Sequence, residues 1–176
     1  SSTPIIKNEL FNKQKLSSSI SLARIKLLDA MIENHDKEDF GFPEDSFPPE
    51  KTIYYTRFRK TGIHRINEEG QYVLDTPIGE ELIDLWNECE SFVASTIEKP
   101  RKIIELIKIL KTQPFKLKQG FLEFWIPVYL FIRQQNFAIY NSNGAFVMSI
   151  NKEFFELLQK KPGDFSIKAF NVNGIK

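Results

Sequence analysis

The chain has 176 residues, enough for one domain of ordinary size or two small ones. Hydrophobic residues make up 41% and charged residues 27% of the sequence, which is typical of a globular protein with a substantial core. The formal net charge of +1 excludes a protein that attracts nucleic acid through a large overall basic excess, so any such binding needs a local patch. The single cysteine, Cys89, excludes an internal disulfide and a cysteine-based zinc site.

The sequence shows neither a membrane span nor a secretory signal. Its most hydrophobic run, residues 121–132, is interrupted by Glu123 and Pro127. That run is shorter than the roughly 20 apolar residues that a membrane-spanning helix needs. The first residues contain no apolar region of the kind found in signal peptides. We therefore expect a cytoplasmic protein without membrane contact.

The first half of the chain predicts helix, loop, helix and hairpin in that order. Apolar residues at steps of three and four from Leu16 to Met31 favour the first helix. Pro49 suits the first turn of the second helix, and Gly62 can end it. The expected elements are a helix over 16–34, an acidic loop over 36–50, a helix over 51–60, and strands over 63–66 and 71–74.

The second half repeats this order after a long helix. The helix expected over 121–135 is apolar on every side, which indicates burial on several sides. Pro127 either kinks that helix or marks its first turn. Asn143-Gly144 predicts a two-residue hairpin turn with positive φ at both positions. The expected elements are a helix over 78–97, a helix restarting at Pro100, a turn over 114–120, the helix over 121–135, strands over 137–140 and 145–148, a helix over 152–160 capped by Asn151, and a strand within 165–170.

These elements predict an α+β fold that is predominantly helical. Residues 17–74 and 101–148 share the order helix, loop, helix, hairpin, which is that of a winged-helix unit. We therefore expect two tandem winged-helix-like units, over 1–76 and 100–176, joined by a connecting helix within 77–99.

The sequence offers no catalytic constellation. A phosphate-binding Gly-x-x-x-x-Gly-Lys-Ser/Thr loop and a zinc-binding His-Glu-x-x-His motif are both missing. The two histidines, His35 and His64, are too few for a histidine-rich metal site, and His35 reads as a solvated helix end among acidic neighbours. Cys89 lies on an apolar helical stripe, which favours a buried structural thiol. We expect no enzyme activity, no cofactor and no metal in this chain.

One segment carries candidate binding residues. Between Lys51 and Arg65 there are five formal positive charges and no acid, together with two tyrosines and a histidine. Such side chains can contact phosphates, which makes DNA binding one hypothesis. The alternative, which we favour, is pairing with the acidic 36–50 loop or with another domain, because the net charge provides no long-range attraction. The candidates are Lys51, Tyr54, Tyr55, Arg57, Arg59, Lys60, His64 and Arg65.

Two stretches resemble the region beyond the nucleotide-hydrolysing core of very large bacterial ATP-binding proteins, including the ATPases of BREX-type phage-defence systems. Residues 6–18 resemble an Asn-Glu-Leu-Ile-Asn-Arg-x-x-Leu-Ser-Ser pattern of that region. Residues 114–120, Pro-Phe-Lys-Leu-Lys-Gln-Gly, and residues 137–147 resemble its Pro-Tyr-Gly-Leu-Lys-x-Gly to Leu-Tyr-Glu-x-Gly-x-Phe-Val element. The sequence departs from the pattern at Pro127 and in the 36–50 loop. The resemblance implies a non-catalytic accessory region of such an ATPase.

The first functional hypothesis is therefore an accessory module that docks protein partners or other domains of its parent protein. The alternative is a DNA-binding module that uses the basic segment from Lys51 to Arg65.

Overall fold

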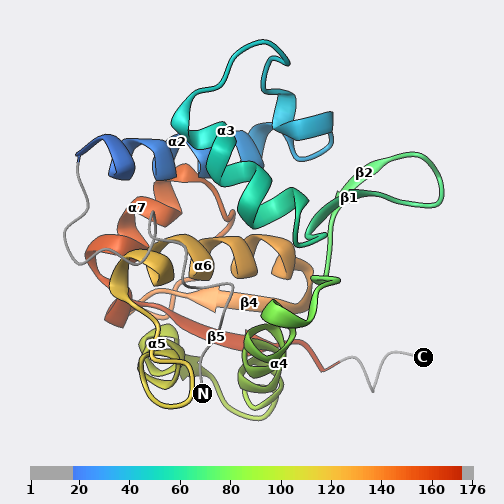
Figure 1. Cartoon of the computed structure of the whole chain (residues 1–176). Helices are drawn as coiled ribbons and strands as arrows, with labels where there is room; N and C mark the ends of the chain where they lie inside the picture. Colours follow the sequence, from blue (N-terminus) through green and yellow to red (C-terminus); the bar gives the residue numbers. More distant parts are fainter. Residues whose placement is uncertain (1–17, 172–176) are drawn as a thin grey trace.

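A computed structural model of the chain describes residues 18–171 (Figure 1). The stretch over 6–18 that carries part of the family resemblance therefore lies almost entirely outside the described residues. The fold is α+β and predominantly helical, as the sequence predicts. In chain order the elements are α2 (Ser18–Asn34), a 3₁₀ turn (Glu38–Gly41), α3 (Pro49–Tyr54), a π-helix (Tyr55–Arg59), β1 (His64–Ile66), β2 (Tyr72–Leu74), α4 (Glu80–Ala94), β3 (Arg101–Lys102), α5 (Ile103–Lys111), α6 (Gln119–Ile132), a 3₁₀ turn (Gln134–Asn136), β4 (Phe137–Tyr140), α7 (Lys152–Lys160), a 3₁₀ turn (Pro162–Asp164) and β5 (Ser166–Ala169).

The elements form layers around α6. Figure 1 shows α2 and α3 above α6, and the small sheet with α4 and α5 below it. The buried side chains of the first and second halves of the chain join in one hydrophobic cluster. The partly buried ion pair between Arg24 of α2 and Glu123 of α6 adds a polar link between the halves. The proposed boundaries at 76 and 99 thus fall within a chain whose two halves share a core.

Helix α6 confirms the burial that its sequence predicts. Nearly every residue from Gly120 to Leu130 is buried, because neighbouring elements cover the helix from above and below. Pro127 lies inside the helix, which begins at Gln119, so its reading as a first-turn proline is wrong. A proline there donates no main-chain hydrogen bond to the preceding turn.

The helix expected over 51–60 is present but changes type along its length. It is α-helical from Pro49 to Tyr54 and continues as a π-helix. The amide of Lys60 donates to the carbonyl of Tyr55 at 2.9 Å, which is the five-residue step of a π-turn. This wider turn separates two buried side chains, Arg57 and Phe58, from the half-exposed Arg59.

The two predicted turns share one hydrogen-bonding pattern. In the β1–β2 hairpin, the Asn67 side-chain oxygen accepts from the amides of Glu69 and Gln71, both at 2.9 Å. The Asn67 carbonyl accepts from the amide of Gly70, whose φ is +81°. This geometry is a type I turn followed by a left-handed glycine, which is common in three-residue hairpin loops. The β1–β2 hairpin itself is confirmed.

Asn141 forms the same turn in the second half. Its side-chain oxygen accepts from the amides of Asn143 and Ala145, and its carbonyl accepts from the amide of Gly144. Gly144 has a φ of +80°, whereas Asn143 is not among the described residues with positive φ. The prediction of positive φ at both positions is therefore wrong, because the glycine occupies the left-handed position after a type I turn rather than inside a two-residue turn.

The strand that follows this turn contributes less than expected. β4 pairs along its length with β5, and the sheet has the order β3-β5-β4. The predicted partner strand, 145–148, is joined to β4 through a single bridge between Tyr140 and Phe146. The strand expected within 165–170 thus provides the main partner of β4.

The remaining helices agree with their predicted positions except at some ends. α4 begins after Gly79 and stops before Ser95, inside the expected range of 78–97. Pro100 is followed by the short strand β3 rather than directly by a helix. α7 is capped as predicted, since the Asn151 side chain accepts from the amide of Phe154 at 2.9 Å.

Candidate functional site

The basic segment from Lys51 to Arg65 does not form one exposed patch. Four of its eight candidate side chains, those of Lys51, Tyr54, Arg57 and His64, are buried. Three of these four belong to helix α3 and the π-helix that continues it, whereas His64 begins strand β1. Their contacts, described below, run mainly into the protein.

Lys51 binds the acidic loop from inside. The side chain is only 1% exposed, and its ammonium group donates to the main-chain carbonyls of Pro43, Glu44 and Ser46. It also lies 4.4 Å from the centre of the Phe47 ring. A buried ammonium needs such partners, because burying it without compensation is costly. Lys51 therefore holds the 43–47 loop in shape and is not available to a phosphate.

Tyr54 and His64 form a buried polar pair. The Tyr54 hydroxyl lies 2.6 Å from His64 Nδ1, and His64 Nε2 lies 2.7 Å from the carbonyl of His35. A carbonyl can only accept, so Nε2 carries the proton and Nδ1 accepts from the hydroxyl. Burial lowers the pKa of His64 and raises the pKa of Tyr54, so both groups are neutral at pH 7.

Asp39 of the acidic loop accepts hydrogen bonds from two further candidate residues, Tyr55 and Arg59. It accepts from the Tyr55 hydroxyl at 3.1 Å and from Arg59 Nη1 at 3.3 Å. The Arg59 side chain remains 55% exposed. Lys60 is exposed and forms no ion pair with a described residue. The expected pairing between the basic segment and the 36–50 loop is therefore present at Arg59.

The last two arginines also face the protein. The Arg57 guanidinium is buried 5.3 Å from the centre of the Phe121 ring, and burial lowers its pKa to about 10. Arg65 donates to the carbonyls of Gly62 and Thr76 at 2.6 and 2.7 Å, and pairs with Asp75. Among the cations of the segment, Arg59 and Lys60 are thus the most accessible within the described residues.

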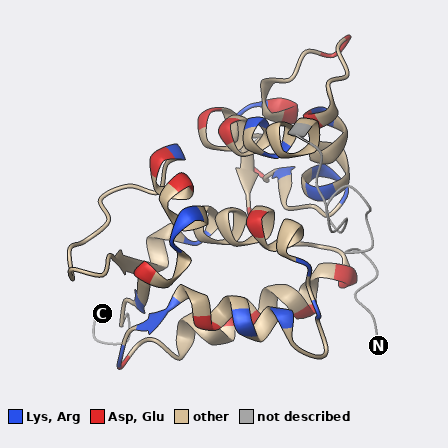
Figure 2. Cartoon of the chain, turned by 90° about the vertical axis from the view of Figure 1, so that its left-hand side faces the viewer, with Lys and Arg blue, Asp and Glu red and all other residues tan. Residues whose placement is uncertain are grey.

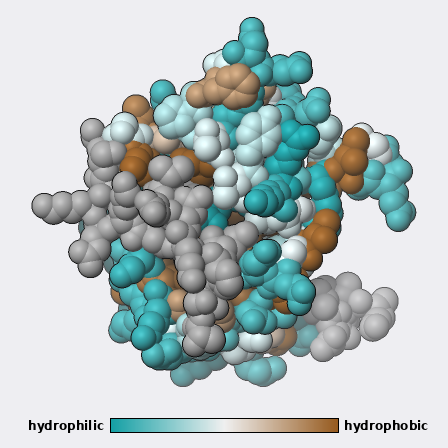
Figure 3. Space-filling model, viewed as in Figure 1, coloured by the Kyte–Doolittle hydropathy of each residue, from teal (hydrophilic) through white to brown (hydrophobic). Residues whose placement is uncertain are grey.

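The charge distribution around the segment is mixed. Figure 2 shows Lys and Arg interspersed with Asp and Glu, without a broad basic face. The projecting β1–β2 hairpin carries Glu68 and Glu69 at its turn, and in Figure 3 its outer end is hydrophilic, whereas hydrophobic side chains show nearer its base. A hairpin with acidic residues at its tip is repelled by phosphates. The geometry therefore gives little support to DNA binding through the first half.

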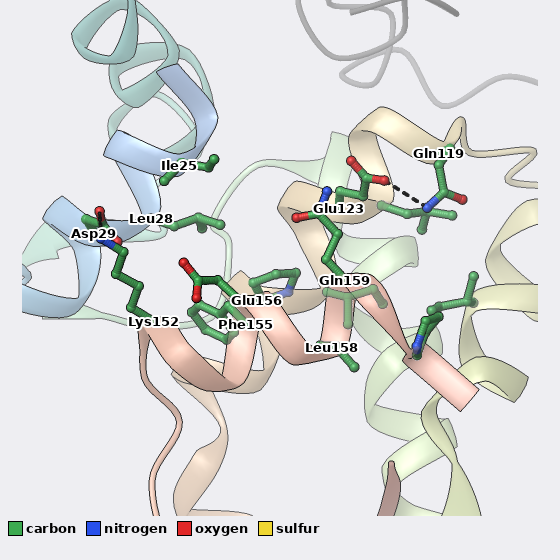
Figure 4. Close-up of a pocket in the computed structure, with 15 residues that line it drawn as sticks. Ile25, Leu28, Asp29, Gln119, Glu123, Lys152, Phe155, Glu156, Leu158 and Gln159 are labelled. Carbon is green, nitrogen blue, oxygen red and sulfur yellow. Dashed lines mark hydrogen bonds and ion pairs between the residues drawn. The ribbon is translucent and has the colours of Figure 1, made fainter. Parts of the chain in front are cut away.

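A second site, which we call the α2–α7 groove, lies between helices α2, α6 and α7, and Ile107 of α5 also lines it (Figure 4). It is a cavity of about 100 Å³. Its wall is apolar and its rim is polar. The apolar wall includes Ile25, Leu28, Leu122, Ile126, Pro127, Phe155 and Leu158, and the rim includes Asp29, Gln119, Glu123, Lys152, Glu156 and Gln159.

The rim of the groove leaves one carboxylate without an ion pair. Asp29 pairs with Lys152 at 3.7 Å, and Glu123 pairs with Arg24 at 2.8 Å. The Asp29 side chain is partly buried, and this burial raises the pKa of its carboxyl. Glu156, on the next turn of α7, forms no ion pair with a described residue. The groove thus offers an apolar wall with a slightly acidic rim.

Sequence reasoning did not find this groove. Its wall residues come from helices far apart in the chain, and each helix separately looks like an ordinary core helix. One signal was available in the sequence: the segment that forms α2 carries apolar residues on more than one face. In the structure Leu22 and Ile25 remain about half exposed. Apolar residues on a second face of a helix indicate that another element or a partner covers that face.

The cysteine Cys89 and the histidine His35 both contact other parts of the protein. Cys89 is fully buried next to the Trp125 indole N–H, which lies 3.4 Å away, and burial raises the pKa of the thiol to about 12. The predicted buried structural thiol is thus confirmed. His35 is half-buried rather than solvated: its ring contacts Phe131 edge-on and its Nδ1 lies 3.0 Å from the carbonyl of Met31.

Two further observations concern the described residues as a whole. They contain no group of three or more His, Cys, Asp and Glu side chains placed to hold a metal ion. None of the helices between residues 18 and 171 combines the length and the apolar character that crossing a membrane requires.

Comparison of the chain with protein-family models, with curated proteins and with solved structures gave no match.

Proposed function

We propose that this chain is a non-catalytic docking module, an accessory region of a large bacterial ATPase of the kind found in phage defence. The observation that carries the docking role is the α2–α7 groove, an apolar cavity with a polar rim on a chain whose basic segment is largely used internally. The parent ATPase follows from the family resemblance of residues 114–120 and 137–147.

The size of the groove favours a protein partner over a small molecule. Small-molecule pockets usually have volumes of about 300–1,000 Å³. The cavity here, about 100 Å³, is smaller and suits one or two side chains that project from a docked segment. Residues of four helices, α2, α5, α6 and α7, line it, and a groove between helices is the setting in which an amphipathic helix lays its apolar face. The occupant in this proposal is such a helix, from another domain of the parent protein, with a basic residue opposite Glu156.

The order of elements adds support to two winged-helix-like units. Both halves run helix, loop, helix and turn, and Asn67 and Asn141 form the same turn at corresponding positions. Winged-helix units serve as docking blocks as well as DNA readers. In the second unit the helix at the recognition position, α6, is buried and leaves almost no surface for a DNA groove.

The alternative function is DNA binding through Arg59 and Lys60, the accessible cations of the basic segment. A titration of duplex DNA at several salt concentrations separates the two proposals. With so few available cations, we expect non-specific binding with a Kd of about 10⁻⁴–10⁻⁶ M or weaker, and a shallow salt dependence. Tight binding that falls steeply with salt, and that is lost in the Arg59→Ala, Lys60→Ala double variant, would contradict docking as the main role.

That double variant is suited to the test because both side chains are exposed, so their loss leaves the core intact. Arg57→Ala is a poor choice, since it empties a buried position beside Phe121 and would weaken binding by unfolding.

A further inference from the structure

The small sheet has one edge that is left open. Beyond β4, residues 145–148 run alongside that strand: the Ala145 carbonyl accepts from the amide of Asn141 at 2.9 Å, and the Val147 amide donates to the Ile139 carbonyl at 2.8 Å. Tyr140 and Phe146 lie between these two bonds as a bridge pair. In antiparallel strands the residues of such a pair direct their own N–H and C=O groups outward. Those of Phe146 therefore point away from β4.

Among the described residues, no main-chain hydrogen bond is made by Phe146 or Met148. The side chains there are also uncovered: Phe146 is 50% exposed and Met148 is 85% exposed. We call residues 145–148 the open edge. An edge strand with unpaired N–H and C=O groups is a template for another strand.

The open edge lacks the features that usually prevent pairing. Monomeric proteins protect edge strands with charged side chains, prolines or bulges that turn the edge away. Residues 134–151 contain no charged residue and no proline. The opposite edge of the same sheet differs, because β3 is two residues long and consists of Arg101 and Lys102. One edge of the sheet is thus protected by charge and the other is not.

We infer that the open edge pairs with the open edge of a second copy of this chain, antiparallel about a two-fold axis at Phe146. In that arrangement the N–H and C=O of Phe146 bond to the C=O and N–H of the same residue in the second copy. A charged partner strand would lose hydration without gaining an ion pair, whereas an identical uncharged edge meets no such cost. The inference does not rest on the proposed docking function, because the open edge and the α2–α7 groove share no residue.

This pairing closes after two copies. The open edges of the two copies pair with each other across the two-fold axis, so the same surface is used on both sides and neither open edge remains unpaired. The outer edges of the joined sheet would then be the two β3 strands, which are short and basic and repel further addition. The expected product is a dimer rather than a fibre.

Sedimentation velocity of the 176-residue chain over a wide range of concentration tests the dimer. We expect a monomer–dimer equilibrium, weakened by about tenfold or more in Met148→Lys, because a lysine on an edge strand opposes pairing with another strand. Leu157→Lys adds the same charge at a half-exposed apolar residue on α7 and should leave the equilibrium unchanged. A chain that stays monomeric at every concentration, or a dimer that Met148→Lys does not weaken, would overturn the inference.

Disulfide trapping tests the position of the axis. The native Cys89 is buried, so an introduced cysteine is the accessible thiol. In Phe146→Cys the paired Cα atoms would lie about 5.5 Å apart, within the range for a disulfide, and mild oxidation should give a covalent dimer. In Met148→Cys the two thiols would be separated by about four residue steps of roughly 3.4 Å and should not link. Linking at 148 but not at 146 would overturn the proposed axis.

Discussion

The Tyr54 hydroxyl lies 2.6 Å from Nδ1 of His64, deep in the first half of the chain. Through its other nitrogen His64 reaches the carbonyl of His35, just beyond the end of α2. Tyr54 and His64, which the sequence indicates as candidate phosphate contacts, thus connect α2, α3 and β1 inside the protein. We expect this pair to make the stability of the fold depend on pH.

The first prediction concerns that dependence. Burial lowers the pKa of His64 below the ordinary value of 6.5, so at mildly acidic pH the unfolded chain binds more protons than the folded one. The free energy of unfolding should therefore be fully retained above pH 6.5 and decrease as the pH falls below it. Urea denaturation at several pH values between about 7.5 and 5 measures this.

His64→Gln provides the control for this prediction, because glutamine takes up no proton. The variant should be less stable at pH 7.5, yet its stability should change less between the two pH values than that of the unchanged chain. Two curves that run parallel over this range would show that His64 does not carry the effect.

The second prediction concerns Lys51. Replacing it with Met keeps an unbranched side chain one atom shorter but leaves three loop carbonyls without their donor. We expect the free energy of unfolding to fall by about 1–3 kcal/mol, the usual cost of removing a buried hydrogen-bond partner. Lys60→Met, at an exposed position of the same segment, should stay within about 0.5 kcal/mol. Equal effects of the two changes would refute the role of Lys51 in holding the loop.

The third prediction compares two glycines with nearly the same backbone angle. Gly62 has a φ of +79° and Gly70 a φ of +81°, so alanine should cost about 1–2 kcal/mol at either position. At Gly62 a Cβ would also lie 2.8 Å from Ile78 Cδ1, whereas at Gly70 it would meet nothing within 4 Å. Gly62→Ala should therefore be the more destabilising change in thermal unfolding.

Ile78→Ala in the Gly62→Ala background should recover only part of the difference between the two glycine variants. It removes Cδ1 and Cγ1 of Ile78 but leaves its Cβ, which would lie 2.9 Å from the new Cβ, and it does not relieve the backbone strain. If both alanine variants melt at the same temperature, the close approach of Ile78 to Gly62 does not constrain the fold.

Much of the fold could be predicted from local signals in the sequence. Helical spacing located α2, α4 and α6, and the glycines of both Asn-x-x-Gly turns located the hairpin turns. The pairing of β4 was missed, because its main partner, β5, is separated from it by α7 and no local pattern specifies which distant strand fills an edge. The type of the Asn141 turn was missed for a related reason, since loop length and register decide the turn type.

The candidate site could be predicted less well. The sequence shows which charged residues the basic segment contains. The direction in which each side chain points depends on tertiary packing and cannot be read from the sequence. Lys51 is buried against the 43–47 loop, and Arg57, within the π-helix, is buried beside the Phe121 ring of α6. Neither the loop shape nor the π-helix has a reliable sequence signal. The α2–α7 groove joins side chains more than a hundred residues apart, such as Ile25 and Phe155. Such a site exists only once the helices have packed.

The fourth prediction tests docking in the full-length protein that contains this chain. A photo-reactive amino acid in place of Gln159, at the rim of the α2–α7 groove, should form a covalent bond to a helical segment of another domain. The same probe in place of Glu69, at the tip of the β1–β2 hairpin, should not give that product. A mass-spectrometric map of the linked peptides identifies the occupant.

The matched variants for this measurement are both on α2. Ile25→Asp places a charge in the wall of the groove and should abolish the crosslink from position 159, whereas Leu22→Asp, at a similarly exposed residue outside the groove, should preserve it. Docking through the α2–α7 groove predicts one interdomain peptide, lost in Ile25→Asp alone. A probe that links only to residues 1–17 of this chain, or to nothing, would contradict it.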